Sequence, residues 1–532
     1  MRPDRRGYPY CWVGIYGRCS LFSIWVRRFR RQNLALGTFG GHALVQDAAY
    51  GTLLREPRRA LHARIADTLE RQFAEIAETQ PELLARHCTE AGLIEKAVGL
   101  WGKAGQRSLE RSALIEAAEQ LKRALDQIET LPCTPAIRQE QIKLQVALIT
   151  PLIHVKGYAA PETRAAADRA RELIEQAEAK GEAAEDPLLL FSVLYSFWVA
   201  NFVAFNGDVA RELANNFLAL AEKQRSAGTI ITGVRILGIT LLHMGEIAPA
   251  RACLDRALAL YDPIAHRPLA TRFGQDCEVS ILSYRSWPLW MLGYPEAALM
   301  DAEQALQRAH EIDQSAALMY ALAVKSMTRN FCRDYAIAKA QTGELIALAD
   351  KKEAPYWKGL GLMQQGCFSF LAGDSTDALP VITSGLAAYR STGATLFLPW
   401  YLSTLARVHA GLGQFESAWQ RINEAVTLVE TAKDRVWEAE VHRMAGEIYL
   451  LPPQRDAAKA QAHFERALDV ARKQQAKSWE LSAAMSMARL WRDQGKRDEA
   501  RDLLAPVYGW FTEGFDTLDL KEAKALVDEL VS

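Results

Sequence analysis

Several sequence patterns that mark common protein classes are missing from this chain of 532 residues. Its eight cysteines form no CxxC pair and have no histidine at metal-ligand spacing, which excludes the usual zinc motifs and favours free thiols in a reducing compartment. No apolar run of about 18 or more residues occurs, so we expect no membrane-spanning helix. The 63 basic and 64 acidic residues give a net charge of −1, without the positive excess of a dedicated nucleic-acid-binding protein. We therefore expect a cytoplasmic protein that binds neither membranes nor nucleic acids.

Motifs for nucleotide, nucleophilic and metal chemistry are also missing. A P-loop needs G-x₄-G-K-[S/T], because backbone amides and the lysine hold phosphate and the hydroxyl holds magnesium. Neither Gly-Lys dipeptide, Gly102-Lys103 or Gly495-Lys496, is followed by a hydroxyl residue, and no G-x-S-x-G or H-E-x-x-H motif occurs. Three early histidines lack a carboxylate or cysteine at fixed spacing and are interpreted as structural or surface residues: His42, His62 and His87. The sequence thus offers no catalytic residue, metal ligand or cofactor site, and we expect a protein that is not an enzyme.

The chain does contain a repeat. The spacing G-x-[apolar]-x-x-A-x₃-[apolar]-x₂-[small]-[apolar] occurs in seven copies, which start at Gly92, Gly245, Gly293, Arg333, Gly373, Gly413 and Gly495. The central alanines recur at intervals of 40, 40, 40, 42 and 40 residues, at Ala298, Ala338, Ala378, Ala418, Ala460 and Ala500. Small residues at fixed positions let two helices approach closely, and a fixed period in this range predicts stacked helical hairpins. The sequence therefore predicts an all-α, tetratricopeptide-like α-solenoid with a long curved surface suited to binding.

Residues 1–41 differ in composition from the rest of the chain. They hold eight arginines and one aspartate, with no lysine or glutamate, and so carry a charge of +7 against −8 for the remainder. Arginines interrupt every apolar stretch, which argues against a signal peptide. We expect this unrelated basic segment to be disordered, or to be the translation of a wrong start or shifted frame upstream of a truncated gene. The alternative is an arginine-rich arm that touches RNA or anionic lipid.

The remainder divides into a helical linker, residues 42–92, and a repeat array, residues 93–532. Helical spacing of apolar residues begins at His42. We expect one helix after Pro57 and further helices over residues 81–92, 93–110 and 113–131, and we expect residues 134–224 to be helical with turns near 157–158, 181–187 and 206–207. The aromatic stretch at residues 197–205 is expected to be buried, with an aromatic-lined pocket as the alternative.

Four short runs carry a family resemblance that covers about residues 42–532. The runs HALVQDAAY (residues 42–50) and LLARH (83–87) resemble the segment that follows the ATPase and winged-helix modules in large bacterial STAND-type signalling ATPases, and the start of their tetratricopeptide-like arm. The runs AAMSMARLW (483–491) and GWFTEGF (509–515) are similar to the end of adenylate/guanylate cyclases with this architecture.

The resemblance implies a truncated protein. In that family a class III nucleotide cyclase domain precedes a P-loop ATPase and then the helical arm, and the catalytic residues of both modules have no counterpart here. It implies a non-enzymatic arm that senses an effector or protein partner and transmits that event to the missing modules. Two alternatives stay open: an adenylate/guanylate cyclase or ATP-binding regulator, like the full-length members of that family, and a free-standing assembly scaffold.

Alignment of the copies by their central alanines places the first helix of each hairpin on the inner face of the solenoid. The candidates for inner-groove contacts are Arg235, Trp287, Trp290, Asn330, Arg407, Arg443, Glu447 and Arg489. Their arginines and tryptophans could bind an acidic peptide or an aromatic ligand through charge-assisted and stacking contacts. The alternative is that the tryptophans pack between helices and the arginines form a solvated face. We thus expect a protein, a peptide or a small effector in the groove.

Overall fold

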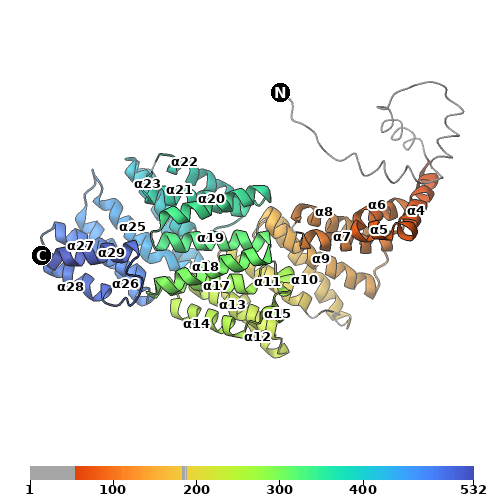
Figure 1. Cartoon of the computed structure of the whole chain (residues 1–532), viewed down its shortest axis with the longest axis horizontal. Helices are drawn as coiled ribbons and strands as arrows, with labels where there is room; N and C mark the ends of the chain where they lie inside the picture. Colours follow the sequence, from red (N-terminus) through yellow and green to blue (C-terminus); the bar gives the residue numbers. More distant parts are fainter. Residues whose placement is uncertain (1–53, 112, 183–185, 187, 375, 532) are drawn as a thin grey trace, which may run out of the picture.

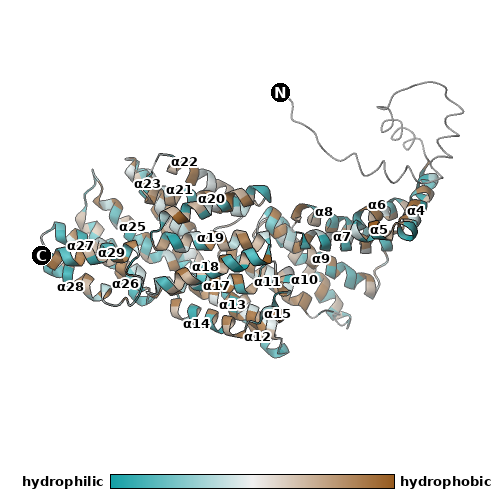
Figure 2. Ribbon diagram, viewed as in Figure 1, coloured by the Kyte–Doolittle hydropathy of each residue, from teal (hydrophilic) through white to brown (hydrophobic). Residues whose placement is uncertain are grey.

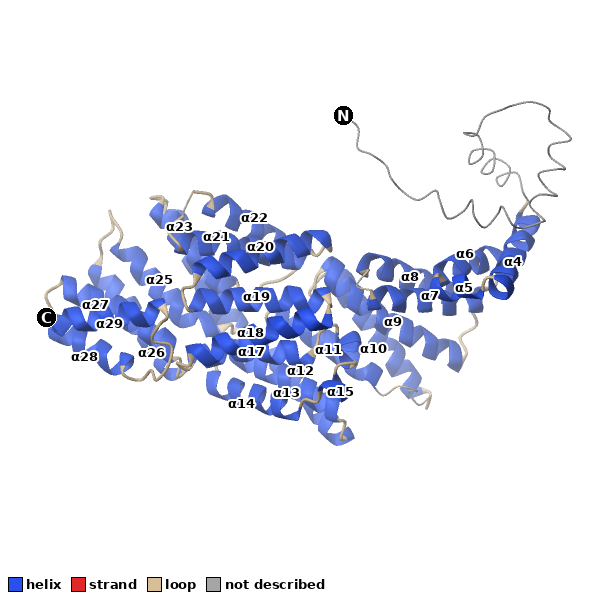
Figure 3. Cartoon of the chain, viewed as in Figure 1, coloured by secondary structure: helices blue, strands red, loops and turns tan. Residues whose placement is uncertain are grey.

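The computed structural model describes residues 54–111, 113–182, 186, 188–374 and 376–531, and every regular element in these ranges is a helix (Figure 3). The helices follow one another along an elongated array, from α4 on the right of Figure 1 to α29 on the left. The predicted tetratricopeptide-like α-solenoid is confirmed. The helix expected to begin at His42 lies mostly outside the described residues.

The first part of the array consists of α4 (Arg55–Gln72), α5 (Ala74–Thr79), α6 (Pro81–Ala91), α7 (Ile94–Glu110), α8 (Leu114–Ile128), α9 (Pro135–Lys156), α10 (Pro161–Ala179), α11 (Leu188–Val203), α12 (Gly207–Gln224), α13 (Ala227–His243), α14 (Ile247–Leu260), α15 (Pro263–His266) and α16 (Leu269–Phe273). The second part consists of α17 (Cys277–Met291), α18 (Pro295–Ile312), α19 (Ser315–Phe331), α20 (Tyr335–Lys351), α21 (Pro355–Leu371), α22 (Ala378–Ser391), α23 (Leu398–Gly411), α24 (Phe415–Ala432), η1 (Arg435–Trp437), α25 (Glu438–Leu450), α26 (Ala457–Lys473), α27 (Lys477–Asp493), α28 (Arg497–Tyr508) and α29 (Leu518–Val531). The helices expected over residues 81–131 and the turns expected near 157–158 and 206–207 are confirmed, and the turn expected near 181–187 lies partly outside the described residues.

The repeat positions have the geometry that the sequence predicts. All seven starting residues adopt a left-handed backbone, with φ between 57° at Arg333 and 92° at Gly293. Glycine is favoured there because it has no Cβ to clash, and it ends one helix so that the next can turn back. The central alanines lie on the second helix of each hairpin and are at most 1% exposed. A Cβ built on Gly385 would lie 2.6 Å from the amide nitrogen of Met363, so the backbones of α21 and α22 nearly touch.

The two helices of a hairpin are buried to different extents. The second helices, such as α18, are amphipathic and bury one face that carries the central alanine. The first helices are buried on nearly all sides: in α17 every residue except Arg285 is buried. Figure 2 shows the corresponding alternation of hydrophilic and hydrophobic residues around outer helices such as α12 and α14. No helix in the described ranges is long and apolar enough to cross a membrane.

The first helices are buried because successive turns of the superhelix contact each other. His243 Nδ1 lies 3.0 Å from Asp434 Oδ1, Ser478 Oγ donates to Trp290 O at 2.5 Å, and Arg333 pairs with Glu522 at 2.6 Å. These partners are 191, 188 and 189 residues apart in sequence. Segments about 190 residues apart in the sequence therefore lie against each other in adjacent turns. We call these three contacts the pitch contacts.

A loop near the C-terminal end adds a further connection between turns. The Ala297 amide donates to Glu513 Oε1 at 3.0 Å, and the Gly514 amide donates to Glu296 Oε1 at 2.7 Å. The loop between α28 and α29 is thereby held against the first turn of α18. The run GWFTEGF, noted in the sequence for its family resemblance, supplies both Glu513 and Gly514.

Candidate ligand-binding surface

The eight predicted inner-groove residues all lie on first helices of hairpins: α13, α17, α19, α23, α25 and α27. The structure divides them into two groups. Arg235, Trp287, Trp290 and Asn330 are buried, and the four from Arg407 onward gather in a charged region.

The buried group lies in an aromatic core between superhelical turns. Trp287 is 2% exposed, and its ring lies 5.7 Å from the rings of both Phe397 and Trp437. Trp290, also 2% exposed, stacks on Phe331 at 4.6 Å and meets Trp479 edge-on at 4.7 Å. Both tryptophans therefore pack between helices in this structure and hold two turns together, and neither is accessible to a ligand.

Arg235 is fully buried beside this core. Its Nη1 donates to Ser280 Oγ at 2.7 Å, and its Cζ lies 5.6 Å from the ring centre of Tyr195. Nε and Nη2 form no hydrogen bond within the described part of the chain. The aromatic ring faces the cation, which offsets part of the cost of its burial.

The aromatic core encloses a small cavity on the inner face of α17, α19, α21 and α23. Its volume is ≈ 30 Å³, and it is lined by Tyr284, Trp287, Tyr320, Ala323, Val324, Met327, Tyr356, Trp357, Leu360, Gln364, Phe397 and Tyr401. This volume suits one or two water molecules rather than an organic ligand. Trp287 Nε1, Trp357 Nε1 and Tyr401 OH have no hydrogen-bond partner among the described residues, so water is their expected partner.

The second group forms a strip of alternating charges, which we call the charged strip. It consists of Arg333, Arg407, Glu440, Arg443, Glu447, Arg489 and Glu522. Arg407, Glu447 and Arg489 occupy equivalent positions in successive repeats, 40 and 42 residues apart. Because equivalent residues of a solenoid line up along its surface, one short sequence period produces a row of charges.

Ion pairs connect the strip in two groups, one around Glu447 and one around Glu522. Arg407 Nη2 lies 3.1 Å from Glu447 Oε2, and Arg443 bonds both Glu447 and Glu440, the latter through two 2.6 Å hydrogen bonds. Glu522 then accepts from Arg489 at 3.0 Å and from Arg333 at 2.6 Å. Arg443 and Glu440 are buried, whereas the side chains of Arg407 and Arg489 are 29% and 39% exposed. Arg407 is therefore linked through Glu447 to the buried Arg443–Glu440 pair, whereas Arg489 is held by the partly exposed Glu522.

The field of the strip is positive. Burial raises the pKa of Glu447, but Arg407 and Arg443 together lower it to about 2, so this carboxylate stays ionised. Burial also raises the pKa of the nearby Tyr335 hydroxyl, which remains a neutral donor. Four arginines against three glutamates leave one net positive charge. Each guanidinium has five N–H donors, and the ion pairs of Arg407 with Glu447 and of Arg489 with Glu522 use one nitrogen each, so donors remain for a ligand carboxylate.

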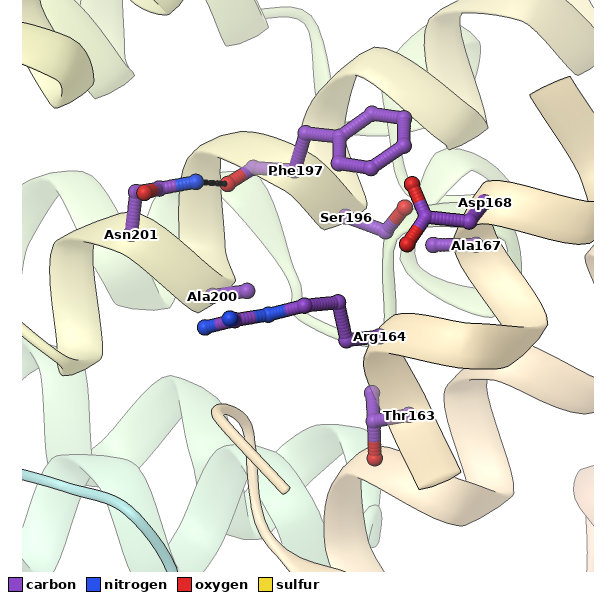
Figure 4. A pocket seen from close by; sticks show the side chains of 8 residues that line it. All are labelled: Thr163, Arg164, Ala167, Asp168, Ser196, Phe197, Ala200 and Asn201. Carbon is purple, nitrogen blue, oxygen red and sulfur yellow. Dashed lines mark hydrogen bonds between the residues drawn. The ribbon is translucent and has the colours of Figure 1, made fainter. Parts of the chain in front are cut away.

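A second, larger hollow lies between α10 and α11 (Figure 4). It has a volume of ≈ 180 Å³ and is lined by Thr163, Arg164, Ala167, Asp168, Ser196, Phe197, Ala200 and Asn201. Four of these residues stem from the last part of α11, within or beside the aromatic stretch at 197–205 that the sequence singled out. Most of that stretch is buried, as expected, but Phe197 and Asn201 are partly exposed at the hollow. Residues of α10 gave no signal in the sequence.

Histidines come together in two places that the sequence did not indicate. His62 and His87 lie on α4 and α6 with their Nδ1 atoms 2.8 Å apart, and His442 and His463 form a similar pair at 3.3 Å. Burial lowers the pKa of His87 and of His442 to about 4. Neither pair belongs to a group of three or more potential metal ligands in the described ranges. His42 lies outside the described residues.

Sequence comparison finds a distant, longer relative. No protein-family model matches the chain. An uncharacterised protein of Rhizobium meliloti (strain 1021) is 23% identical over 450 residues, which cover 84% of this chain and 43% of the relative. The chain thus spans less than half the length of the curated relative it matches.

Solved structures of other proteins resemble this chain to different degrees. A Rap protein in complex with competence and sporulation factor has a TM-score of 0.51 and 11% identity, over 71% of this chain and 98% of the Rap chain. The Cut9–Hcn1 complex of the APC/C has a TM-score of 0.45 and 14% identity, over 92% of this chain and 99% of that chain. At these identities the likeness concerns the fold.

Proposed function

We propose that this chain is a protein-interaction and effector-sensing arm that binds an acidic peptide or an acidic segment of a partner protein on the charged strip. The observation that carries the proposal is the row of partly exposed arginines, each fixed by one ion pair with donors to spare. A Rap protein of similar fold was solved in complex with competence and sporulation factor, which supports a binding role for such a solenoid. The buried tryptophans argue against the aromatic ligand that the sequence also suggested.

The proposal extends to the setting of the arm. We propose that it serves a larger signalling protein of the STAND ATPase type, as the family resemblance suggests, and that it contributes no catalysis itself. Support comes from the relative, in which the matched region makes up 43% of a longer chain. A ligand on the strip would bias such a protein only through a difference in affinity between its two states.

Binding of labelled acidic peptides, followed by fluorescence anisotropy, tests the interaction. We expect acidic peptides to bind more tightly than basic peptides of equal length, with an affinity that falls as salt is added. The double variant Arg407→Glu/Arg489→Glu should weaken binding at least about tenfold, because two like charges then face the peptide. The control Arg501→Glu changes an exposed arginine that pairs with Asp498 and Asp502 on its own helix, and should leave affinity unchanged. Equal binding by the double variant and the wild type would contradict the proposal.

Two further experiments separate this setting from the alternatives. Formation of cyclic AMP or hydrolysis of ATP by the purified chain would show that the protein is an enzyme after all. Translation of the DNA upstream of the His42 codon in all three frames should reveal a P-loop and a cyclase coding region. Their absence would favour a free-standing scaffold.

A further inference from the structure

The hollow between α10 and α11 exists because small side chains face each other across the two helices. The helices run antiparallel here, so Thr163 and Ala167 of α10 face Ala200 and Ser196 of α11. None of these four side chains is long enough to close the gap between the helix axes. The result is a recess with a small, mostly apolar floor, far along the array from the charged strip (Figure 1).

The rim of the recess carries two opposite charges that do not neutralise each other. Arg164 and Asp168 are one helical turn apart on α10, a spacing at which an ion pair commonly forms. No such pair exists: Figure 4 shows their side chains diverging, with the Asp168 carboxylate toward Ser196 and the Arg164 guanidinium toward Ala200. Asp168 Oδ1 accepts from Arg171 at 3.1 Å, and Arg164 forms no ion pair with any described residue.

An aromatic side chain and an amide complete the rim. The ring of Phe197 is fixed by Arg171, whose Cζ lies 4.9 Å from the ring centre. Asn201 Nδ2 donates to the Phe197 carbonyl at 2.9 Å, which orients the amide and leaves its oxygen as an acceptor. The recess therefore offers a guanidinium at one end, a carboxylate at the other, and apolar surface between them.

From this arrangement we infer that the recess is a binding site for a free apolar α-amino acid. The carboxylate of the ligand pairs with Arg164, its ammonium group pairs with Asp168 Oδ2, and its side chain lies on Ala167, Ala200 and the Phe197 ring. A zwitterion makes both contacts at once, whereas a simple acid pairs only with Arg164 and a simple amine only with Asp168 Oδ2. A free amino acid also matches the volume of ≈ 180 Å³, whereas a peptide carries its two terminal charges on different residues. The site is independent of the function proposed for the charged strip.

Titration of the full chain with the standard α-amino acids, one at a time, tests this site. Saturation-transfer NMR detects binding, and isothermal titration gives the affinity. We expect at least one apolar amino acid to bind, and its decarboxylated amine and its deaminated acid to bind at least about tenfold more weakly, since each loses one charge-assisted pair.

Three variants assign the binding to the recess. Arg164→Gln and Asp168→Asn should each weaken binding at least about tenfold, and Ala200→Leu should abolish it by filling the floor. The matched control Arg169→Gln alters a neighbouring exposed arginine that pairs with Glu172 and does not line the recess. It should bind as the wild type does.

Several outcomes would overturn the inference: no amino acid binds, the amine or the acid binds as well as the amino acid, or the rim variants bind as the wild type does. Because Ala200 is buried, its replacement could disturb folding, which circular dichroism would reveal. In that case Arg164→Gln and Asp168→Asn decide the matter, since both side chains lie at the surface and their loss leaves the packing intact.

Discussion

The pitch contact between His243 and Asp434 provides a direct test of how the superhelix is held closed. The side chains are 0% and 2% exposed, and Nδ1 of the histidine lies 3.0 Å from Oδ1 of the aspartate. His243 Nε2 and Asp434 Oδ2 have no other partner among the described residues. We predict that His243→Phe lowers the free energy of unfolding by about 3–5 kcal/mol, because it leaves a buried carboxylate without its hydrogen bond.

The loss of stability should come from the Asp434 carboxylate that stays buried without its partner, and not from lost packing around position 243. Rings surround His243 on several sides, among them Phe202 at 5.2 Å and Phe397 at 5.4 Å, and a phenylalanine ring keeps most of these contacts. In the double variant His243→Phe/Asp434→Ala no charge is left buried. We therefore expect the double variant to be more stable than His243→Phe alone, as is often found when a buried pair is replaced by apolar groups.

Urea unfolding followed by tryptophan fluorescence measures both effects, since Trp287 and Trp437 lie 6.1 and 6.4 Å from the His243 ring. The control is Glu222→Gln, which removes an exposed pair with Arg256 and should cost less than about 1 kcal/mol. The single variant Asp434→Ala completes the comparison. If the stability losses of His243→Phe and Asp434→Ala add up to the loss of the double variant, to within about 0.5 kcal/mol, the reasoning is refuted. The same holds if His243→Phe costs no more than the control.

Three further predictions concern packing, pH and the charged strip. Ala418→Leu, at a fully buried repeat position, should overpack the core, lower the free energy of unfolding by about 1–3 kcal/mol and so lower the melting temperature. Gln420→Leu, on the exposed face of the same helix, should not lower it. Burial lowers the pKa of His154 from 6.5 to about 4, so as the pH falls the unfolded chain takes up this proton before the folded chain does. The free energy of unfolding should therefore drop by about 3 kcal/mol between pH 6.5 and 4. His154→Phe should remove that part of the pH dependence in urea titrations. Arg443→Met should cost about 3–5 kcal/mol in the same assay, because the buried Glu440 loses both of its guanidinium hydrogen bonds; a cost near zero would mean that the pair does not anchor the strip.

The hairpins could be predicted from the sequence because their signals are local. A glycine that must take a left-handed backbone and an alanine that must fit between two helices lie five residues apart in most copies, and both recur with the period. Even where the glycine is missing, as at Arg333, the alanine at position 338 kept the copy recognisable, and the structure places Arg333 in the same conformation.

The placement of the inner-face residues could not be predicted in the same way. Trp287 and Arg407 lie on equivalent faces of first helices, yet one is enclosed and the other is partly exposed. The difference arises from residues such as Trp437, which lie several repeats further along the chain and reach Trp287 because the array curves back on itself. That curvature results from small rotations added over several repeats, and no local sequence pattern records their sum.

The charged strip and the pitch contacts share two residues, Arg333 and Glu522, which connects binding with shape. Glu522 pairs with Arg489 of the strip and also with Arg333, and the second of these pairs is a pitch contact. A ligand carboxylate that binds either arginine brings a second negative charge close to Glu522, and the repulsion weakens the link between two superhelical turns. By thermodynamic linkage, a chain whose turns have separated at this point would then bind the ligand more tightly. The aromatic core around Trp287 would stay closed throughout, because it contains no exposed charge for a ligand to engage.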